Sequence, residues 1–264
     1  MHTSTRWWDR YLAAAALIGA TALLLAPPAG LLDKADHAAY AVCARLPGHV
    51  FVVAGRPLPL CALCSGAYLA GLAGLVALIL AGRARASALP PRRYVAIFTL
   101  FILAWAVDGL NSYVSFFTDL PPLYEPANLL RLATGALAGL ALAAFLLPVL
   151  NLSLWAAPSP APSVGSWRDL AWLLVGGAIV VGLVGSEWPP LLYPLALLSG
   201  AAVIALIAAV NLMIVLMLLR RDGQATRWRE LLAPLVVALA LALTELWAIA
   251  AARALLTARL GLPF

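Results

Sequence analysis

The sequence predicts an all-α bundle of transmembrane helices. Hydrophobic residues fill 64% of its 264 positions and charged residues only 11%, so a soluble domain of this length could not cover its apolar surface with polar groups. A helix needs about 20 mostly apolar residues to cross the hydrocarbon core of a bilayer. The long runs of Ala, Leu, Val and Ile do not alternate with polar residues, which argues against a membrane β-barrel. The chain is therefore expected to be a polytopic helical membrane protein.

Seven stretches are long and apolar enough to span the membrane, at 7–26, 63–81, 94–117, 128–150, 170–186, 191–219 and 231–256. The first could also be a cleaved signal peptide. Aromatic residues at its start, Trp7, Trp8 and Tyr11, are typical of the membrane interface, so we expect a retained helix. We expect residues 1–264 to form one integral membrane domain.

Arginines predict the orientation of this domain. They crowd two short connections that are four spans apart and therefore on the same side: Arg83, Arg85, Arg92 and Arg93, then Arg220, Arg221, Arg227 and Arg229. The positive-inside rule places that side in the cytoplasm, with the N-terminus inside and the C-terminus outside the cytoplasmic membrane. On the outer side, basic residues occur singly, at Lys34, Arg45, Arg56, Arg253 and Arg259. The net charge of +6 suits anionic lipid and gives no reason to expect a nucleic-acid partner.

Two connections are long. The cytoplasmic segment 151–169 is rich in Pro and Ser, which predicts a mobile linker between two possible subbundles. The extracytoplasmic loop 29–62 carries Cys43 and Cys61, and Cys64 follows directly. Because Pro59 suits the start of a helix, Cys61 and Cys64 are expected in the opening turns of the second span, three residues apart on one face.

Three interpretations of the cysteines remain open. Cys61 and Cys64 could cycle between dithiol and disulfide, with Cys43 as a third thiol, because the positive end of a helix dipole favours thiolates. All three could bind zinc, with His49 or His37 as the fourth ligand of a tetrahedral site. Two of the cysteines could instead form a disulfide that only stabilises the loop, while the third stays unpaired and has no function.

The cysteine region resembles the domain of unknown function 2085 family of predicted prokaryotic membrane proteins. The resemblance covers roughly residues 36–139. Its first block consists of Cys43, Pro47, Phe51, Gly55, Leu58, Pro59, Cys61, Cys64, Gly66 and Tyr68, and its second of Asp108, Gly109, Asn128, Arg131, Thr134 and Gly135. The resemblance implies a membrane protein and assigns no reaction. The chain departs from the family at three positions, because Ala44 replaces a His, Leu63 replaces an Arg and His49 stands where an Arg is common.

Ionisable residues within the spans predict a second group of site residues. Asp108 and Arg131 are expected near the outer ends of neighbouring spans, and a direct ion pair between them would remedy the cost of burying each charge. Asn111 and Asn128 could complete this network. Glu245 is expected near the middle of the last span, where a hydrogen bond from Asn211 or a role in proton movement would account for it.

These observations support several functions. As an enzyme, the protein would perform thiol–disulfide exchange through Cys61 and Cys64, with a membrane quinone as electron acceptor. As an accessory or assembly subunit, it would use a loop held by a disulfide or a zinc ion. A proton-coupled transporter is a third hypothesis, carried by Glu245. Gly71-x-x-Gly74 and Gly135-x-x-x-Gly139 predict close helix contacts within the bundle or with other membrane proteins.

Overall fold

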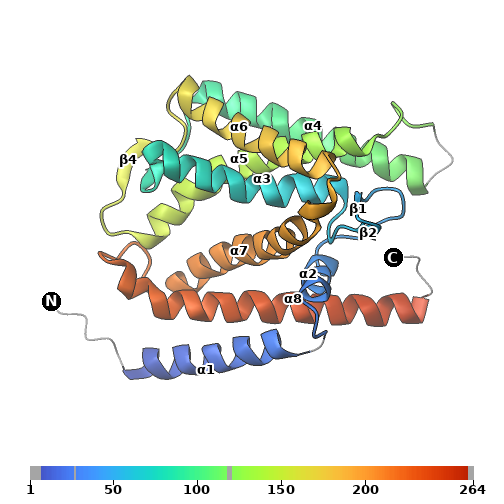
Figure 1. Cartoon of the computed structure of the whole chain (residues 1–264). Helices are drawn as coiled ribbons and strands as arrows, with labels where there is room; N and C mark the ends of the chain where they lie inside the picture. The colour runs from blue at the N-terminus through green and yellow to red at the C-terminus, as the bar shows by residue number, and fades with distance from the viewer. Residues whose placement is uncertain (1–6, 27, 118–120, 261–264) are drawn as a thin grey trace.

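Helices account for nearly all regular structure in the computed structural model, which describes residues 7–26, 28–117 and 121–260 (Figure 1). The helices are α1 (Trp7–Leu25), α2 (Leu31–Tyr40), α3 (Ala62–Leu78), α4 (Arg92–Phe117), α5 (Asn128–Leu154), α6 (Trp167–Gly185), α7 (Leu192–Leu218) and α8 (Leu232–Leu260). A π-helical turn, η1 (Ile79–Arg83), extends α3, and short 3-10 turns, η2 (Pro189–Leu191) and η3 (Trp228–Leu231), precede α7 and α8. The strands β1 (Val52–Val53), β2 (Arg56–Pro57), β3 (Ala86–Ala88) and β4 (Ser159–Pro162) are short.

Within the described residues, six helical stretches are long and apolar enough to cross a membrane, and they coincide with the second to seventh predicted spans: Ala62–Arg83, Arg92–Val114, Asn128–Leu154, Trp167–Gly185, Pro189–Leu218 and Trp228–Arg259. The all-α membrane bundle is thus confirmed. The first predicted span forms α1, in which Tyr11–Leu25 is a shorter apolar helix. The side chains of Trp7 and Trp8 lie outside the described part of the chain. Seven crossings and the orientation stay predictions.

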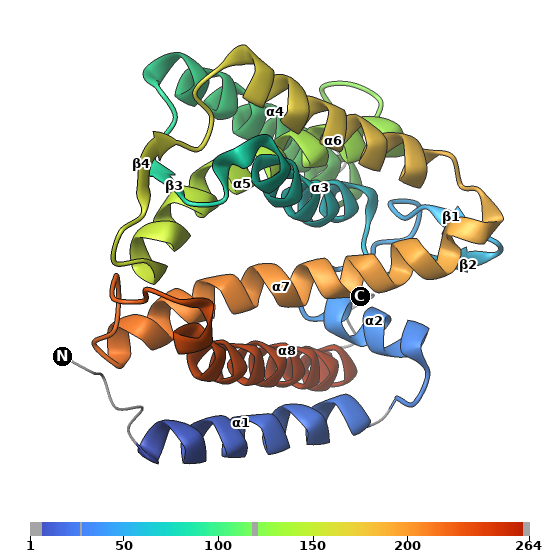
Figure 2. The same cartoon turned by 60° about the vertical axis from the view of Figure 1, so that its left-hand side comes forward.

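The helices form two groups (Figure 2). In the first group α3 packs most extensively against α5, while α4 and α6 pack beside them. In the second, α8 lies between α1 and α7, and α2 packs against α7 and α8. Contacts of α7 with α3 and α5 join the groups. Because α6 follows segment 151–169 and yet packs against α3 and α5, the two groups do not divide the chain at that segment.

Glycines allow α3 and α5 to approach backbone to backbone. A Cβ atom added to Gly66 would overlap the carbonyl oxygen of Leu132, and one added to Gly135 or Gly139 would overlap a carbonyl oxygen of α3. Such contacts are typical of small-residue interfaces between membrane helices. Both glycines of the predicted Gly135-x-x-x-Gly139 pair therefore serve contacts within the bundle.

Segment 151–169 is packed and hydrogen-bonded, so the prediction of a mobile linker was wrong. β4 pairs in parallel with β3, and Ser163 donates a hydrogen bond of 2.6 Å to the carbonyl oxygen of Ala144. Val164 is fully buried. Proline prevents this segment from forming a helix, but an extended segment can still bury apolar side chains and pair its remaining backbone groups.

The predicted loop 29–62 is folded and lies at one end of the bundle, opposite β3 and β4 (Figure 2). It contains α2 and the antiparallel pair β1–β2. Arg56 forms ion pairs with Asp33 at 2.6 Å and Asp36 at 2.9 Å, and Arg45 contacts Asp36 at 3.2 Å. These pairs link α2 to the rest of the loop and fix the chain that leads to the cysteines.

Candidate metal centre

The three cysteines converge, although Cys43 and Cys61 are far apart in the sequence. The sulfur atoms of Cys43, Cys61 and Cys64 all lie within 4.8 Å of one another. Cys43 is buried, Cys61 and Cys64 are partly buried, and all three are free thiols. Three soft ligands at this separation can coordinate one metal ion.

The start of α3 presents two of the sulfurs. Cys61 is the residue that precedes the first helical turn, and Cys64 lies within that turn. This confirms the predicted position of the pair at the start of the helix. The backbone N–H of Cys61 donates to the sulfur of Cys43 at 3.3 Å, so an otherwise unpaired helix N–H group stabilises negative charge on that sulfur.

The second group of helices holds Cys43. Its backbone N–H donates to the carbonyl oxygen of Ala39, just before the end of α2. Its side chain packs in a buried cluster with Val203 of α7 and Leu246 of α8. Arg253, near the end of α8, donates hydrogen bonds of 2.5 Å to the carbonyl oxygens of Tyr40 and Cys43. The thiol cluster therefore lies where the two helix groups meet.

The environment distinguishes the thiols electrostatically. The S–H groups of Cys61 and Cys64 donate to the sulfur of Cys43, which lowers the pKa of Cys43 to about 3 despite its burial. The same interaction raises the pKa of Cys61 to about 11, because the neighbouring thiolate disfavours a second negative charge. The cluster without metal thus shares protons around one thiolate.

A cavity of about 220 Å³ opens beside the sulfurs. All three cysteines line it, together with His49 and Arg131. Leu63, at the position where the family resemblance leads one to expect an Arg, also lines it. A ligand in this cavity would meet both the thiols and the guanidinium group.

His49 contacts Arg131 and does not join the sulfurs. Its Nε2 lies 3.2 Å from Nη2 of Arg131. Because arginine only donates, Nε2 accepts this hydrogen bond and the ring carries its proton on Nδ1. Burial, and then the charge of Arg131, lower the pKa of His49. Among the described residues, the potential metal ligands that converge here are the three cysteines, without the predicted fourth ligand His49.

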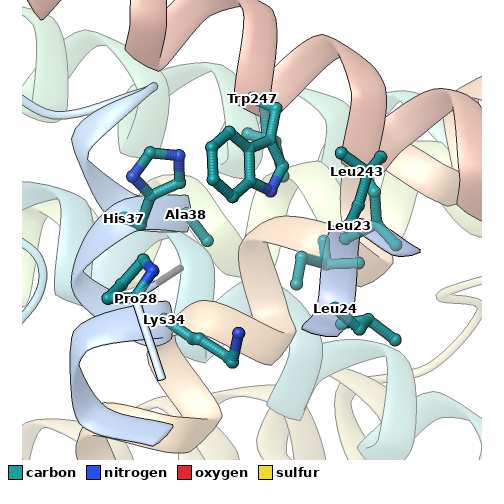
Figure 3. A pocket seen from close by; sticks show the side chains of 10 residues that line it. Leu23, Leu24, Pro28, Lys34, His37, Ala38, Leu243 and Trp247 are labelled. Atoms are coloured by element: carbon teal, nitrogen blue, oxygen red, sulfur yellow. The ribbon is translucent and has the colours of Figure 1, made fainter. Parts of the chain in front are cut away.

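His37, the other predicted fourth ligand, lies in a different pocket. Its ring packs against Trp247 with centroids 4.2 Å apart, and Lys34 and Leu243 line the same small cavity (Figure 3). Its Nε2 atom is buried and has no hydrogen-bond partner among the residues that the structure describes. Burial, and then the charge of Lys34, lower the pKa of His37.

A polar network behind the cysteines is built around Arg131 of α5, which is buried. Nε of Arg131 donates to Ser112 at 2.8 Å, and Nη1 donates to Oδ1 of Asn128 at 2.8 Å. The side-chain amide of Asn128 in turn donates to the carbonyl oxygen of Gly48 at 3.0 Å. The guanidinium group therefore connects α4, α5 and the cysteine-bearing loop.

Asp108 belongs to the same helix pair but does not form the predicted ion pair with Arg131. Asp108 accepts hydrogen bonds from Tyr124 at 2.6 Å and Thr134 at 3.0 Å, and the ion pairs of the described residues do not include it. The register of α4 and α5 explains this difference. It sets Asp108 opposite Thr134, while Arg131 faces Ser112 one turn farther along α4.

The remaining predicted polar residues have separate roles. Asn111 accepts from the backbone N–H of Leu123 at 2.6 Å and donates to the carbonyl oxygen of Tyr124 at 2.9 Å, so it holds the backbone of these two residues against α4. Glu245 of α8 accepts a hydrogen bond of 2.9 Å from Asn211 of α7, the partner that the sequence suggested. Its role in proton movement stays a prediction.

Sequence reasoning gave no site role to four residues. Ser112 and Tyr124 are ordinary polar residues whose partners depend on how α4 and the chain after it pack, and Thr134 was marked only by the family resemblance. Arg253 did leave a signal, since it is a basic residue on the side predicted to be poor in positive charge. Its structural use is to bind the carbonyl oxygens around Cys43.

Comparison with known proteins bears on the segment just described. Residues 43–145 match the model of a family described as predicted membrane protein, DUF2085. This confirms the family resemblance. The DUF2085 segment contains the three cysteines, His49 and the network around Arg131 and Asp108, whereas α7 and α8 lie beyond it. The searches of curated proteins and of solved structures found no match.

Proposed function

We propose that this membrane protein binds one soft metal ion, with zinc as the first candidate, through Cys43, Cys61 and Cys64. The convergence of the three sulfurs within 4.8 Å is the observation that carries the proposal. Zinc prefers four ligands in a tetrahedral arrangement, and sites with three protein ligands leave one position for water or substrate. The cavity beside the sulfurs gives such a ligand room.

The surroundings suit a negatively charged metal–thiolate group. Metal binding requires deprotonated sulfur, and the N–H of Cys61 already supports a thiolate at Cys43. Arg131 places a buried positive charge on the wall of the same cavity. Because Cys43 packs with α7 and α8 while Cys61 and Cys64 belong to α3, a bound ion would also tie the two helix groups together.

Elemental analysis of the purified protein tests this function. We expect about one zinc ion per chain, as in a single-ion site with three protein ligands. Cys61→Ser should lose the metal, whereas His37→Gln should retain it because His37 lies in a separate pocket. The proposal would be contradicted if the Cys61→Ser protein retained zinc. It would also be contradicted if the wild-type protein, with all its thiols reduced, did not bind zinc.

Thiol–disulfide exchange is the second candidate, and the position of Cys43 within reach of both other sulfurs favours it. In that reaction two thiols lose two electrons and two protons to form a disulfide, and a membrane quinone takes them up to become a quinol. Counting alkylatable thiols before and after treatment of metal-free protein with a soluble quinone tests this step. The count should fall from three to one; an unchanged count would rule out the exchange with quinone.

We infer that the cysteines face the outer side of the cytoplasmic membrane, with the N-terminus inside and the C-terminus outside. The first arginine-rich connection contains β3, at the opposite end of α3. The second, between α7 and α8, pairs through Ala225 with Trp155, shortly before β4, so both support this orientation. A membrane-impermeant maleimide should label the thiols of intact spheroplasts after zinc is chelated. Labelling only after the membrane is permeabilised would indicate the opposite orientation, but it would not contradict the metal site.

A further inference from the structure

A long groove runs along the surface of α3, α6 and α7, away from the thiol cluster. It encloses about 380 Å³, and nearly all of its lining is apolar. Along α3 and η1 it extends from Leu69 to Leu80, and along the antiparallel α6 from Leu183 back to Trp172. At about 1.5 Å per residue it is about 16 Å long, close to half of the hydrocarbon core of about 30 Å. Its length therefore matches the acyl chains of one leaflet.

A polar cavity of about 300 Å³ continues the groove at its arginine-rich end. The two share Leu80 and Trp172, and the polar cavity adds Arg83 and Arg168. We call this polar cavity the mouth of the groove. Trp172 thus lies at the boundary between the apolar groove and its charged mouth, and tryptophan is typically enriched at such boundaries in membrane proteins.

The acid in this mouth is already neutralised. Asp169 accepts two hydrogen bonds from Arg83, at 2.8 and 3.3 Å, and two more of 2.9 Å from the backbone N–H groups of Gly165 and Ser166. Arg168 is exposed, and it takes part in none of the ion pairs formed within the described ranges. The mouth therefore keeps a net positive charge.

Local backbone geometry places Arg83 at this mouth. The π-helical turn Ile79–Arg83 ends α3, and Gly82 has a φ angle of 80°, which favours glycine. The chain turns there, and Arg83 reaches the first turn of α6. Glycine in this left-handed conformation commonly ends a helix.

We propose that the groove and its mouth bind one anionic phospholipid. An acyl chain would lie between α3 and α6, and the phosphate would bind Arg168 and the outer face of the Arg83 guanidinium. A zwitterionic lipid such as phosphatidylcholine carries the same phosphate, but its quaternary ammonium group would lie beside Arg83 and Arg168 and be repelled by them. This site is independent of the metal centre, because it lies at the other end of α3.

Native mass spectrometry of the detergent-purified protein tests the headgroup. Phosphatidylglycerol should bind more tightly than phosphatidylcholine with the same chains. Arg168→Gln should weaken phosphatidylglycerol binding about fivefold, the equivalent of about 1 kcal/mol, whereas Arg229→Gln, another exposed arginine of the basic side, should not. Equal binding of both lipids, an equal loss in Arg229→Gln, or binding of glycerol phosphate as tightly as phosphatidylglycerol would overturn the proposal.

A pair of glycine variants on α6 tests the acyl groove. Gly176 lines the groove and a Cβ there makes only ordinary contacts with Ala73 and Ala77, while Gly182 has nothing within 4 Å and does not line it. Gly176→Leu should abolish lipid binding and Gly182→Leu should preserve it. Unchanged binding in a folded Gly176→Leu protein would refute the groove as the acyl site. If that variant fails to fold, the Arg168→Gln titration decides the proposal.

Discussion

Replacing Gly135 with Ala should force α3 and α5 apart and disturb the thiol cluster. The added Cβ would overlap the carbonyl oxygen of Leu63 and lie 3.2 Å from the backbone N of Ala67. Backbone atoms cannot rotate away as a flexible side chain could, so we take the upper end of the usual overpacking cost, about 3 kcal/mol. Alanine's better helix propensity offsets about 1 kcal/mol. The net loss of about 2 kcal/mol corresponds to a fall in melting temperature of about 4–8 °C.

Thermal unfolding in detergent measures this effect, with Gly182→Ala as the matched control because its Cβ would meet nothing within 4 Å. Leu63 lies between Cys61 and Cys64, so displacing its carbonyl group should also weaken zinc binding. A Gly135→Ala protein that melts within about 1 °C of the control and keeps its metal affinity would refute the close backbone contact and its link to the site.

Three further predictions concern the polar groups. Tyr124→Phe should destabilise the protein by about 1–3 kcal/mol, because fully buried Asp108 loses its 2.6 Å hydrogen bond, whereas the exposed control Tyr193→Phe should melt like the wild type. In zinc-free protein the low pKa of Cys43 keeps its thiolate until the pH falls through about 3, so Cys43→Ser should leave the Raman S–H intensity at neutral pH unchanged; a drop of about a third would contradict the shared-proton cluster. Because the pKa of His49 is lowered below 6.5, the unfolded chain binds more protons in acid and stability falls as pH drops below that value. His49→Gln should flatten this dependence in pH-resolved melting curves, and an unaltered slope would contradict it.

Composition and local pattern were enough to predict the helices and part of the site. Six of the predicted spans are long apolar helices in the structure. Length and composition predict them because a helix satisfies its own backbone groups within lipid. The start of α3 at the cysteine pair follows from local signals, namely Pro59 and the three-residue spacing of Cys61 and Cys64. The family resemblance also marked the segment that contains the site.

Features that depend on contacts distant in sequence could not be predicted. The hydrogen bond from Arg253 to the carbonyl oxygen of Cys43 joins residues 210 positions apart. Charge pairing suggested a bond between Asp108 and Arg131, but helix register decides partners, and it gave them Thr134 and Ser112. Proline content indicated the absence of a helix in segment 151–169, yet it carried no information on the pairing of that segment with β3.

X-ray absorption spectroscopy of the zinc-loaded protein tests the central claim most directly. Three sulfur neighbours at about 2.3 Å and one lighter atom at about 2.0 Å are expected around the metal. A zinc ion surrounded only by nitrogen and oxygen atoms would contradict a metal centre built from the three converging cysteines.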